Sequence, residues 1–298
     1  MIKARRIGHA AFETPDLARA IEYYTRVNGL VLTSQERNRA FLATKVGQLV
    51  LELTQADTGR CTKLSFEVAP HSDFDGISHH LTREGIRSDI RSDPLPGTSK
   101  SLTFQDPKGT TMELFADWQY LGAHHQVVGV GPLKLGHVAF IVHDAKAIAD
   151  FYQKVLGFRV SDWVEDFFVF MRCGPDHHTI NFLSGETVRM HHIAFEVKDF
   201  AQIQTACELF GERDIPIIWG PLRHGPGHNV STYHRNPDDQ VVEFYTELDQ
   251  MKDEELGYFE PRPWHHDLPQ RPKVWSRSKP PTVWGPPPTE DYLRNRQP

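Results

Sequence analysis

The sequence has little of several features that would each identify a class of protein. Its 298 residues include three scattered cysteines, Cys61, Cys173 and Cys207, which are too few for a disulfide framework or a thiolate metal site and favour a reducing cytoplasm. No apolar run approaches the roughly 20 residues that span a bilayer, and the N-terminal stretch lacks the apolar core of a secretory signal. The formal net charge is -6 and there is no basic run, which argues against nucleic acid as a partner. We therefore expect a soluble, cytoplasmic globular protein with no membrane partner.

An internal repeat is the clearest positive feature. The stretch IGHAAFETPDLARAIEYYTRVNGLVL, which begins at Ile7, is echoed by LGHVAFIVHDAKAIADFYQKVLGFRV, which begins at Leu135. Each reads as a strand followed by an amphipathic helix, and the helix ends near Gly29 in the first copy and Gly157 in the second. Shorter echoes, such as KLSFEV and HIAFEV, indicate two such modules in each half. The chain is therefore predicted to consist of two homologous halves.

The C-terminal tail differs in composition from both halves. From residue 260 onward it is rich in proline, which blocks helices and central strands, yet it also carries Trp264, Trp275 and Trp284. Tryptophan is unusual in disordered sequence. We predict an extended arm that packs on the body of the protein or on a neighbouring subunit.

Two predicted strands each direct one histidine toward a cavity. In GHVAFIV, His137 shares its face with the small residue Ala139, and in HHIAFEV, His192 shares its face with Ala194. The bulky apolar residues of both strands occupy the opposite faces, where they suit packing against a helix. By the same alternation, His191 is expected to point away from His192.

A carboxylate on a third predicted strand completes a candidate metal site. Glu243 lies between Val242 and Phe244, and burying a carboxylate among apolar neighbours is costly unless it is paired or bound to a metal. Two histidines and one carboxylate match the facial triad of non-heme Fe(II) oxygenases, which leaves coordination positions open for substrate and dioxygen. We predict that His137, His192 and Glu243 converge as metal ligands.

These motifs resemble a known family. GHVAF, HHIAF, GPLRHGPGHN and YHRNPDDQVVEFY are similar to motifs of the vicinal oxygen chelate superfamily, and within it of the two-domain extradiol ring-cleaving dioxygenases. The resemblance covers roughly residues 5–250. It implies an α+β fold with two tandem domains, each of paired βαβββ modules that form a half-open barrel. The expected domains are residues 1–122 and a catalytic domain at 133–250, followed by a Pro/Trp-rich extension at 251–298.

The resemblance also implies a cofactor and a reaction. The three ligands would hold Fe(II), or less often Mn(II), and the enzyme would open the ring of a catechol with O2. The expected setting is aromatic-compound degradation, and the expected assembly is a homo-oligomer. A histidine on the strand before the second ligand would serve as acid–base catalyst. Apolar alternation with Ile180 and Phe182 selects His178 for this role, whereas the spacing to the second ligand keeps His177 open.

Further residues of the C-terminal half are implied as substrate ligands. His224 and Tyr233 fall at the family's substrate-hydrogen-bonding positions and are also implied in catalysis, and His228 and Asn229 are additional candidates on the same loop. Aromatic residues are expected to line the pocket and to favour a substituted or bicyclic catechol: Trp163, Phe167 and Phe168.

The N-terminal half departs from the ligand pattern. His9 and Glu113 occupy the first and third ligand positions, but the second is Lys63, a cation that would repel a metal. This site is therefore expected to be vestigial.

Two other functions remain open from the sequence. A glyoxalase-like isomerase or epimerase tends to use four protein ligands, and Glu196 is the available second carboxylate on the face of His192. A non-catalytic small-molecule binder is the other alternative, although it would not need a complete triad with acid–base residues beside it.

Overall fold

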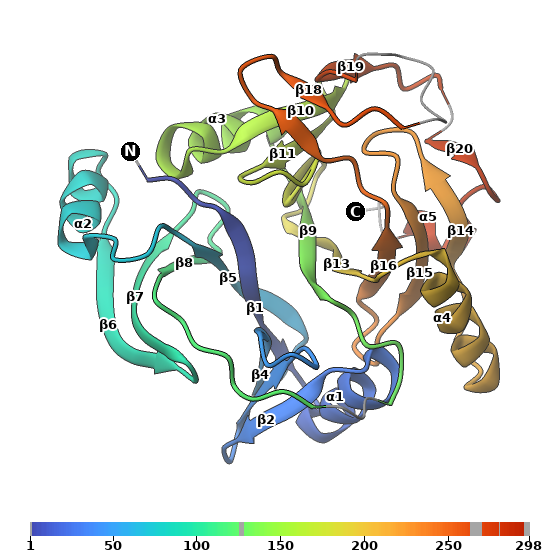
Figure 1. The fold of residues 1–298 in the computed structure, drawn as a ribbon, viewed down its shortest axis with the longest axis horizontal. Coiled ribbons are helices and arrows are strands. Elements are labelled where there is room, and N and C mark those ends of the chain that lie inside the picture. The colour runs from blue at the N-terminus through green and yellow to red at the C-terminus, as the bar shows by residue number, and fades with distance from the viewer. Residues whose placement is uncertain (1, 125–127, 263–269, 280, 295–298) are drawn as a thin grey trace.

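Two curled β-sheets lie side by side in the protein, each with helices on its outer surface (Figure 1). The structure is a computed structural model that describes residues 2–124, 128–262, 270–279 and 281–294. Within these residues the N-terminal sheet has eight strands in the order β2-β3-β4-β1-β5-β8-β7-β6. Its elements are β1 (Arg6–Thr14), α1 (Leu17–Tyr23) continued by the π-helical η1 (Tyr24–Asn28), β2 (Val31–Gln35), β3 (Arg39–Ala43), β4 (Leu49–Gln55), β5 (Arg60–Glu67), α2 (Phe74–Arg83), β6 (Ser88–Leu95), β7 (Thr98–Gln105) and β8 (Thr111–Phe115).

The C-terminal sheet repeats the same arrangement and gains a strand at each edge. Its order over the described residues is β19-β10-β11-β12-β9-β13-β16-β15-β14-β20. The elements of the repeat are β9 (Lys134–Val142), α3 (Ala145–Leu156), β10 (Arg159–Val164), β11 (Phe168–Arg172), β12 (Ile180–Ser184), β13 (Arg189–Glu196), α4 (Phe200–Glu212), β14 (Trp219–His224), β15 (Val230–Arg235) and β16 (Val241–Thr246).

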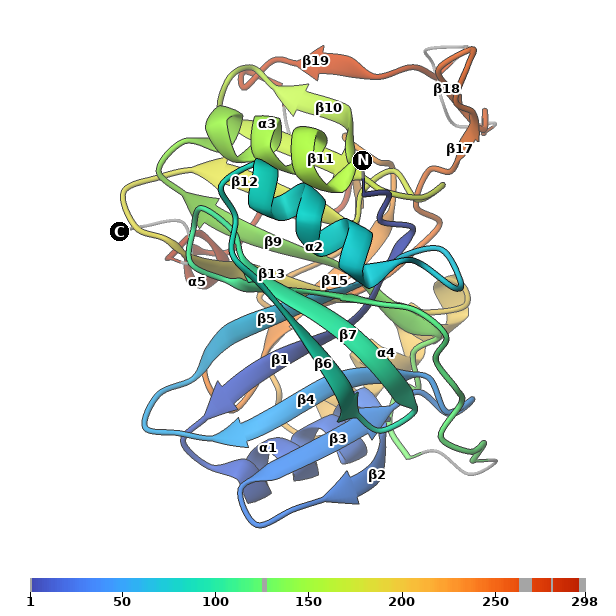
Figure 2. The same cartoon turned by 90° about the vertical axis from the view of Figure 1, so that its left-hand side faces the viewer.

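Strand pairing shows how each half is built from two modules. In the N-terminal half, β1 runs parallel to β4, β5 runs parallel to β8, and β1 and β5 pair antiparallel at the seam between the modules. In the C-terminal half, β9 pairs in the same way with β12, β13 with β16, and β9 with β13. Each half thus combines two βαβββ modules in one curled sheet, as Figure 2 shows from the side. The predicted fold is confirmed, whereas the domain boundaries at 122, 133 and 250 stay a prediction.

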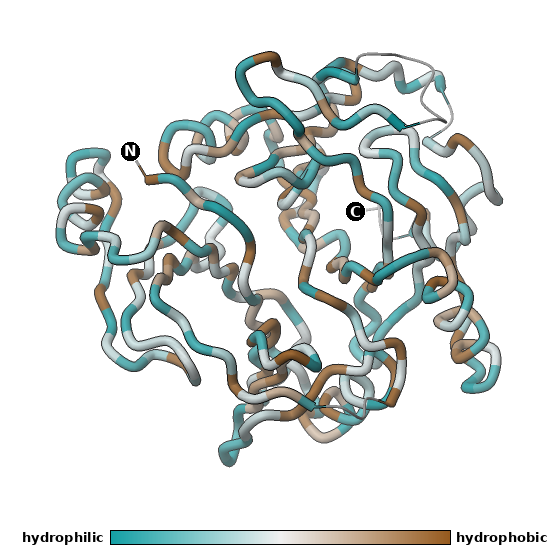
Figure 3. The backbone as a smooth tube through the Cα atoms, viewed as in Figure 1, coloured by the Kyte–Doolittle hydropathy of each residue, from teal (hydrophilic) through white to brown (hydrophobic). Residues whose placement is uncertain are grey.

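Side-chain alternation explains which face of each strand meets the helices. On β9, Val138, Phe140 and Val142 belong to the main hydrophobic core, whereas the alternate residues His137, Ala139 and Ile141 do not. Figure 3 shows hydrophobic and hydrophilic segments mixed along the backbone of both halves. One face of the strand therefore packs against the helices, and the other face lines the interior of the curled sheet.

One helix of each half packs against the other half. On α3, the hydroxyl of Tyr152 donates to Asp106 at 2.8 Å, and the ring of Tyr23 on α1 reaches His234 on β15, with 2.6 Å between Oη and Nε2. The core is continuous across both halves. The two halves therefore pack against each other through a shared hydrophobic core.

Acid is expected to destabilise the protein through His234. Burial lowers the pKa of this imidazole to about 3, whereas an unfolded histidine has a pKa of about 6.5. Between these values the unfolded chain binds a proton that the folded chain does not, so stability falls as pH falls, by about 1.4 kcal/mol per pH unit. Urea unfolding at pH 6, 5 and 4 should give the wild type a fall in stability that is steeper, by about 1.4 kcal/mol per pH unit, than that of His234→Gln. Equal slopes for the two proteins would show that His234 does not cause the acid sensitivity.

The C-terminal extension packs on the body of the protein in its described parts. Its elements are β17 (Met251–Asp253), β18 (Tyr258–Phe259), β19 (Lys273–Trp275), β20 (Thr282–Trp284) and α5 (Glu290–Arg294). Strand β19 pairs parallel with β10, and β20 pairs antiparallel with β14. The arm therefore borders the C-terminal sheet at both edges. Of the three tryptophans used to predict it, Trp264 lies outside the described residues.

No helix in the described part of the chain is long and apolar enough to cross a membrane.

Candidate metal centre and pocket

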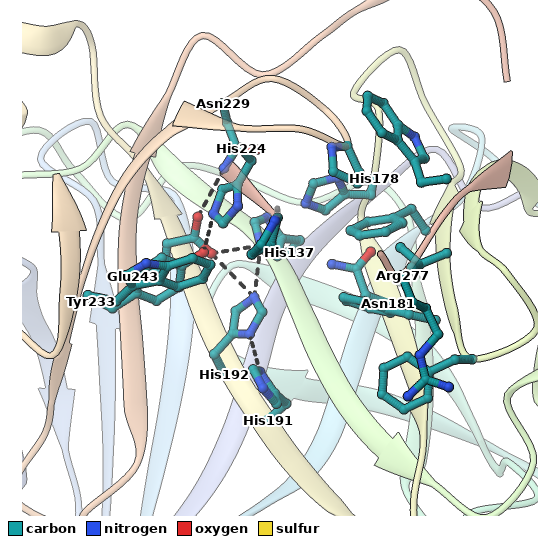
Figure 4. Close-up of a pocket in the computed structure, with 18 of the residues that line it drawn as sticks. His137, His178, Asn181, His191, His192, His224, Asn229, Tyr233, Glu243 and Arg277 are labelled. Atoms are coloured by element: carbon teal, nitrogen blue, oxygen red, sulfur yellow. Dashed lines mark hydrogen bonds and ion pairs between the residues drawn. The ribbon is translucent and has the colours of Figure 1, made fainter. Parts of the chain in front are cut away.

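Three buried side chains from three adjacent strands converge in the C-terminal half. The Nε2 atoms of His137 and His192 lie 3.2 Å apart, and Glu243 Oε2 lies 3.1 Å from the first and 3.3 Å from the second. Strands β9, β13 and β16 are neighbours in the sheet, which brings together residues separated by up to 106 positions (Figure 4). Among the described residues these three side chains form the group that could hold a metal ion.

The donor atoms fit a single cation. Three ligands each about 2.1 Å from an ion, at right angles to one another, lie about 3 Å apart, which is close to the observed separations. Two imidazole nitrogens and a carboxylate oxygen facing one point are all electron-pair donors. Burial alone would raise the pKa of Glu243, but His137 and His192 hold it well below its ordinary value, so the carboxylate is ionised. The set is the 2-His-1-carboxylate type that suits Fe(II) or Mn(II).

The other oxygen of the carboxylate is held by the protein. Glu243 Oε1 accepts hydrogen bonds from Ser231 Oγ at 2.6 Å and from Asn229 Nδ2 at 3.0 Å. Such contacts fix the orientation of a ligand and leave Oε2 directed at the metal position. Asn229, predicted to bind substrate, lines the pocket but also has this orienting contact.

The triad forms the base of a pocket of about 440 Å³. Aromatic rings make much of its wall, and Figure 4 shows Arg277 and Asn181 across the pocket from Glu243. Of the aromatic residues expected there, Phe167 and Phe168 line it, whereas Trp163 packs against the core instead. The remaining aromatic residues of the wall are Phe170, Trp219, Tyr233, Trp275 and Tyr292.

His178, not His177, faces this pocket. The His178 ring lies 4.3 Å from that of His137 between centroids, and burial is the largest cause that lowers its pKa well below 6.5. His177 lies behind it, with 3.0 Å between the two Nδ1 atoms. The residue is the one selected from the sequence, but the reason was wrong. Ile180 and Phe182 face the core, and His178 reaches the pocket because it precedes β12 and does not follow that strand's alternation.

His224 and Tyr233 meet on the opposite side of the triad. His224 Nε2 lies 2.7 Å from the hydroxyl of Tyr233, and both residues line the pocket. Burial lowers the pKa of His224 to about 4 and raises that of Tyr233 well above 10. At neutral pH, His224 is therefore uncharged and Tyr233 keeps its proton, so the pair can exchange hydrogen bonds with a ligand's oxygen atoms.

His228 has a different environment from the one its predicted role requires. Its Nδ1 lies 2.7 Å from Asp249 Oδ2, and the residue is not among those that line the pocket. In the structure this histidine joins the loop before β15 to the segment after β16. Its implied contact with substrate stays a prediction that the geometry does not favour.

His191 lies on the same side as His192, and the expectation that it points away is wrong. The pairing register of β13 with β9 shifts between Met190 and His192, which is a β-bulge that breaks the alternation of side chains. As a result His191 lines the pocket, and its Nδ1 lies 2.7 Å from Nδ1 of His192. A contact of this kind orients the metal-facing ring.

Sequence reasoning missed Asn181 and the contribution of the extension. Asn181 is buried on β12, directly beside Ala139 of β9, and its Oδ1 has no hydrogen-bond partner in the structure. An unpaired buried amide oxygen at a pocket wall is suited to a ligand. Alternation along β12 could have identified it. The residues of the extension could not have been found in this way, because their positions depend on long-range pairing.

Glu196, the candidate fourth ligand of an isomerase, is engaged elsewhere. Its Oε2 lies 2.9 Å from Nζ of Lys134, and it does not join the group of metal-ligating side chains in the described residues. The centre thus has one carboxylate rather than two, which disfavours the isomerase alternative.

The equivalent position in the N-terminal half is filled by an ammonium group. Lys63 Nζ lies 3.2 Å from Glu113 Oε2 and 2.9 Å from Glu52 Oε2, while His9 Nε2 lies 2.9 Å from Glu113. Burial alone would raise the pKa of Glu113, but the His9 hydrogen bond and nearby charges lower it. A positive charge therefore already neutralises the carboxylates that a metal would need.

One metal ion per chain is expected for this reason. Elemental analysis of Fe(II)-loaded protein should give one iron per chain, and His9→Ala should leave this content unchanged. His192→Ala should remove it, because within the described part of the chain the C-terminal centre alone has three donors without a competing ammonium group. Two irons per chain would contradict this prediction.

Known proteins share this fold over nearly the whole chain. The chain is 24% identical to metapyrocatechase from Pseudomonas sp. (strain CF600), over 80% of this chain and 85% of that protein. It is also 24% identical to an iron-dependent extradiol dioxygenase from Rhodococcus jostii (strain RHA1), over 84% and 91%. An Mn(II)-bound glyoxalase from Novosphingobium aromaticivorans has a TM-score of 0.84 at 23% identity, covering 98% of this chain and 94% of that one.

A second solved structure has a similar fold, and a family model matches both halves of the chain. Homoprotocatechuate 2,3-dioxygenase from Brevibacterium fuscum, in complex with 3,4-dihydroxyphenylacetate, has a TM-score of 0.82 at 22% identity, over 99% of this chain and 93% of that one. The model of the Glyoxalase/Bleomycin resistance protein/Dioxygenase superfamily matches residues 6–114 and 134–244, which is once in each half. The two matches together span most of the chain and coincide with the two curled sheets, so the protein belongs to the Glyoxalase/Bleomycin resistance protein/Dioxygenase superfamily.

Proposed function

We propose that the protein is an extradiol dioxygenase that opens the ring of a substituted catechol with O2. The observation that carries this proposal is the single-carboxylate triad of His137, His192 and Glu243 at the base of an aromatic pocket. Curated relatives with this activity support it across more than three-quarters of the chain. When bound there, Fe(II) would activate the catechol hydroxyls as a Lewis acid and couple the substrate electronically to O2, and Mn(II) is the alternative ion.

The side chains around the triad supply the proton chemistry. Because burial keeps His178 uncharged, it can accept a proton from a catechol hydroxyl and later return it to an oxygen atom of the opening ring. Tyr233 keeps its hydroxyl proton and can donate a hydrogen bond to a substrate oxygen, with His224 orienting that hydroxyl from 2.7 Å. The pocket holds the ring against these groups, so the reaction benefits from orientation.

The pocket wall indicates a substrate larger than catechol itself. A volume of about 440 Å³, with seven Phe, Trp and Tyr residues in its lining, has room for a ring substituent or a second ring. Arg277 and Lys279 add positive charge on one side, where the Arg277 guanidinium lies 4.4 Å from the centre of the Phe167 ring. Among substituted catechols of equal size, we therefore expect those with an anionic substituent to bind better than neutral ones.

A colour assay tests the proposed function. Protein purified without oxygen and loaded with Fe(II) should consume O2 and form yellow ring-opened products when mixed with mono- and bicyclic catechols. The panel should include neutral and carboxylate-bearing catechols of matched size. Absence of both colour and oxygen uptake across the panel would refute the proposal.

An isomerase is the second candidate, since a glyoxalase is among the structural neighbours. The Lys134–Glu196 ion pair counts against it, because it removes the second carboxylate. Turnover of a glutathione hemithioacetal without oxygen would favour the isomerase.

We also propose that the protein is cytoplasmic. The three cysteines are free thiols, which is compatible with the reducing cytoplasm. We expect a homo-oligomer, and light scattering of the purified protein would measure its mass.

A further inference from the structure

We propose that Asp162 and His177 are positioning residues that hold His178 in the tautomer able to accept a proton, and that the C-terminal extension completes this arrangement. The inference deepens the proposed function and rests on it. It assigns a role to a buried carboxylate, a buried histidine and a tryptophan that the reaction outlined above does not use.

The residues form a continuous chain of contacts behind the pocket. Asp162 Oδ2 lies 3.2 Å from Nε2 of His177, and Nδ1 of His177 lies 3.0 Å from Nδ1 of His178. Asp162, His177 and His178 are all buried, with exposed fractions of 2%, 1% and 3%. Water therefore does not compete for these contacts, and the three side chains serve as hydrogen-bond partners for one another.

The donor and acceptor roles follow from the carboxylate. An ionised carboxylate only accepts hydrogen bonds, so His177 donates to Asp162 through Nε2–H. A neutral His177 then has a lone pair on Nδ1, which accepts a hydrogen bond from Nδ1–H of His178. His178 is consequently left with a lone pair on Nε2. This is the nitrogen that remains for a substrate hydroxyl, since His178 lines the pocket.

The same contacts stabilise the product of the proton transfer. When Nε2 of His178 accepts a proton, the ring becomes an imidazolium that still donates through Nδ1 to His177. His177 is polarised in turn by the negative charge of Asp162, and no proton needs to move beyond His178. When His178 returns its proton, the original hydrogen-bond pattern is restored. The proton count balances without any further acid or base.

The extension holds the carboxylate in place. Trp275 Nε1 donates to Asp162 Oδ2 at 2.6 Å, and the backbone N–H of Lys273 donates to Oδ1 at 2.9 Å. Both residues belong to β19, which pairs with β10, the strand that carries Asp162. These two donors orient the carboxylate toward His177, so a segment more than 100 positions away in sequence takes part in positioning the catalytic base.

Close packing prevents the two histidine rings from turning away. Gly227 lies against both rings, and a Cβ atom there would come within 3.2 Å of His177 Nδ1 and of His178 Cε1. On the other side, the ring of Phe259 lies 4.8 Å from that of His177. The loop that carries Gly227 thus closes over the contact between the two Nδ1 atoms.

The first test replaces Asp162 by asparagine and follows the ionisation of a bound ligand. The amide carries no negative charge, and its NH2 group cannot accept a hydrogen bond. In either orientation it therefore loses a contact that Asp162 makes to Trp275 or Lys273, and it no longer holds His177 and His178 in these tautomers. We expect kcat with catechols to fall by at least about 10²-fold, with KM and iron content little changed. Without oxygen, 4-nitrocatechol bound to the iron-loaded wild type should absorb as the doubly ionised form, and with Asp162→Asn as the singly ionised form.

A matched control separates positioning from stability. Asp106 is also buried, and it accepts hydrogen bonds from Tyr152 at 2.8 Å and from the backbone N–H of Thr110 at 3.0 Å, but it lies in the other half of the protein. Asp106→Asn should lower the melting temperature without changing the bound 4-nitrocatechol spectrum or kcat per iron. A spectral change as large in Asp106→Asn as in Asp162→Asn would overturn the inference.

A double variant gives a second, independent measurement. His177→Phe should lower kcat as much as Asp162→Asn, and the double variant should be no worse than the poorer single variant, because both act through His178. The positioning role would be overturned if the kcat losses of the two single variants multiplied in the double variant. It would also be overturned if Asp162→Asn left the spectrum and kcat unchanged. If the wild type itself neither bound nor cleaved any catechol, the proposed function would fail and this inference with it.

Discussion

Replacing Glu243 by alanine should abolish both metal binding and ring cleavage. The carboxylate supplies one of three donors, and its loss leaves two imidazoles that face each other at 3.2 Å without a negative charge to balance a divalent cation. Elemental analysis should show iron near zero, and oxygen uptake with any catechol should fall to background. This is the largest effect expected from a single substitution.

A nearby carboxylate provides the control for that prediction. Glu196 follows His192 on β13 but pairs with Lys134 outside the metal centre. Glu196→Gln should keep one iron per chain and most of the activity. A catalytically active, iron-containing Glu243→Ala protein would show that the centre lies elsewhere.

Replacing His178 by phenylalanine should slow turnover by about 10²–10⁴-fold while iron stays bound. The ring of His178 touches that of His137 but contributes no donor to the triad, so the metal centre should survive. Stopped-flow measurement of product formation, with iron content determined on the same sample, separates the two effects. Full activity would remove His178 from the mechanism, and loss of iron would show a structural role instead.

Strand alternation in the sequence was sufficient to predict the triad. His137 and Glu243 lie on regular strands, where every second side chain faces the same way, so their apolar neighbours indicated the direction of each side chain. The internal repeat supplied the equivalence of His137 and His192. Both patterns can be recognised in the sequence alone, because neither depends on the tertiary structure.

The same rule failed where a strand is interrupted or has not begun. The bulge before His192 places His191 in the pocket, against expectation, and His178 precedes β12, so the apolar residues of that strand do not indicate its direction. A bulge depends on how two strands pair, and the path of a loop depends on what packs over it, here Gly227 and its neighbours. Neither is encoded in a repeating pattern of side chains.

The sequence by itself determined the two-fold repeat, the α+β modules and the convergence of His137, His192 and Glu243, because each follows from a periodic pattern or from equivalence between copies. Only the tertiary structure decided the surroundings of the centre. Trp275 reaches Asp162 across 113 positions, and Lys63, which the sequence already placed at the second ligand position, also pairs with Glu52. Such contacts depend on how the sheets curl and on which edge the extension pairs with, and these are set by the packing of the whole chain rather than by any local run of residues.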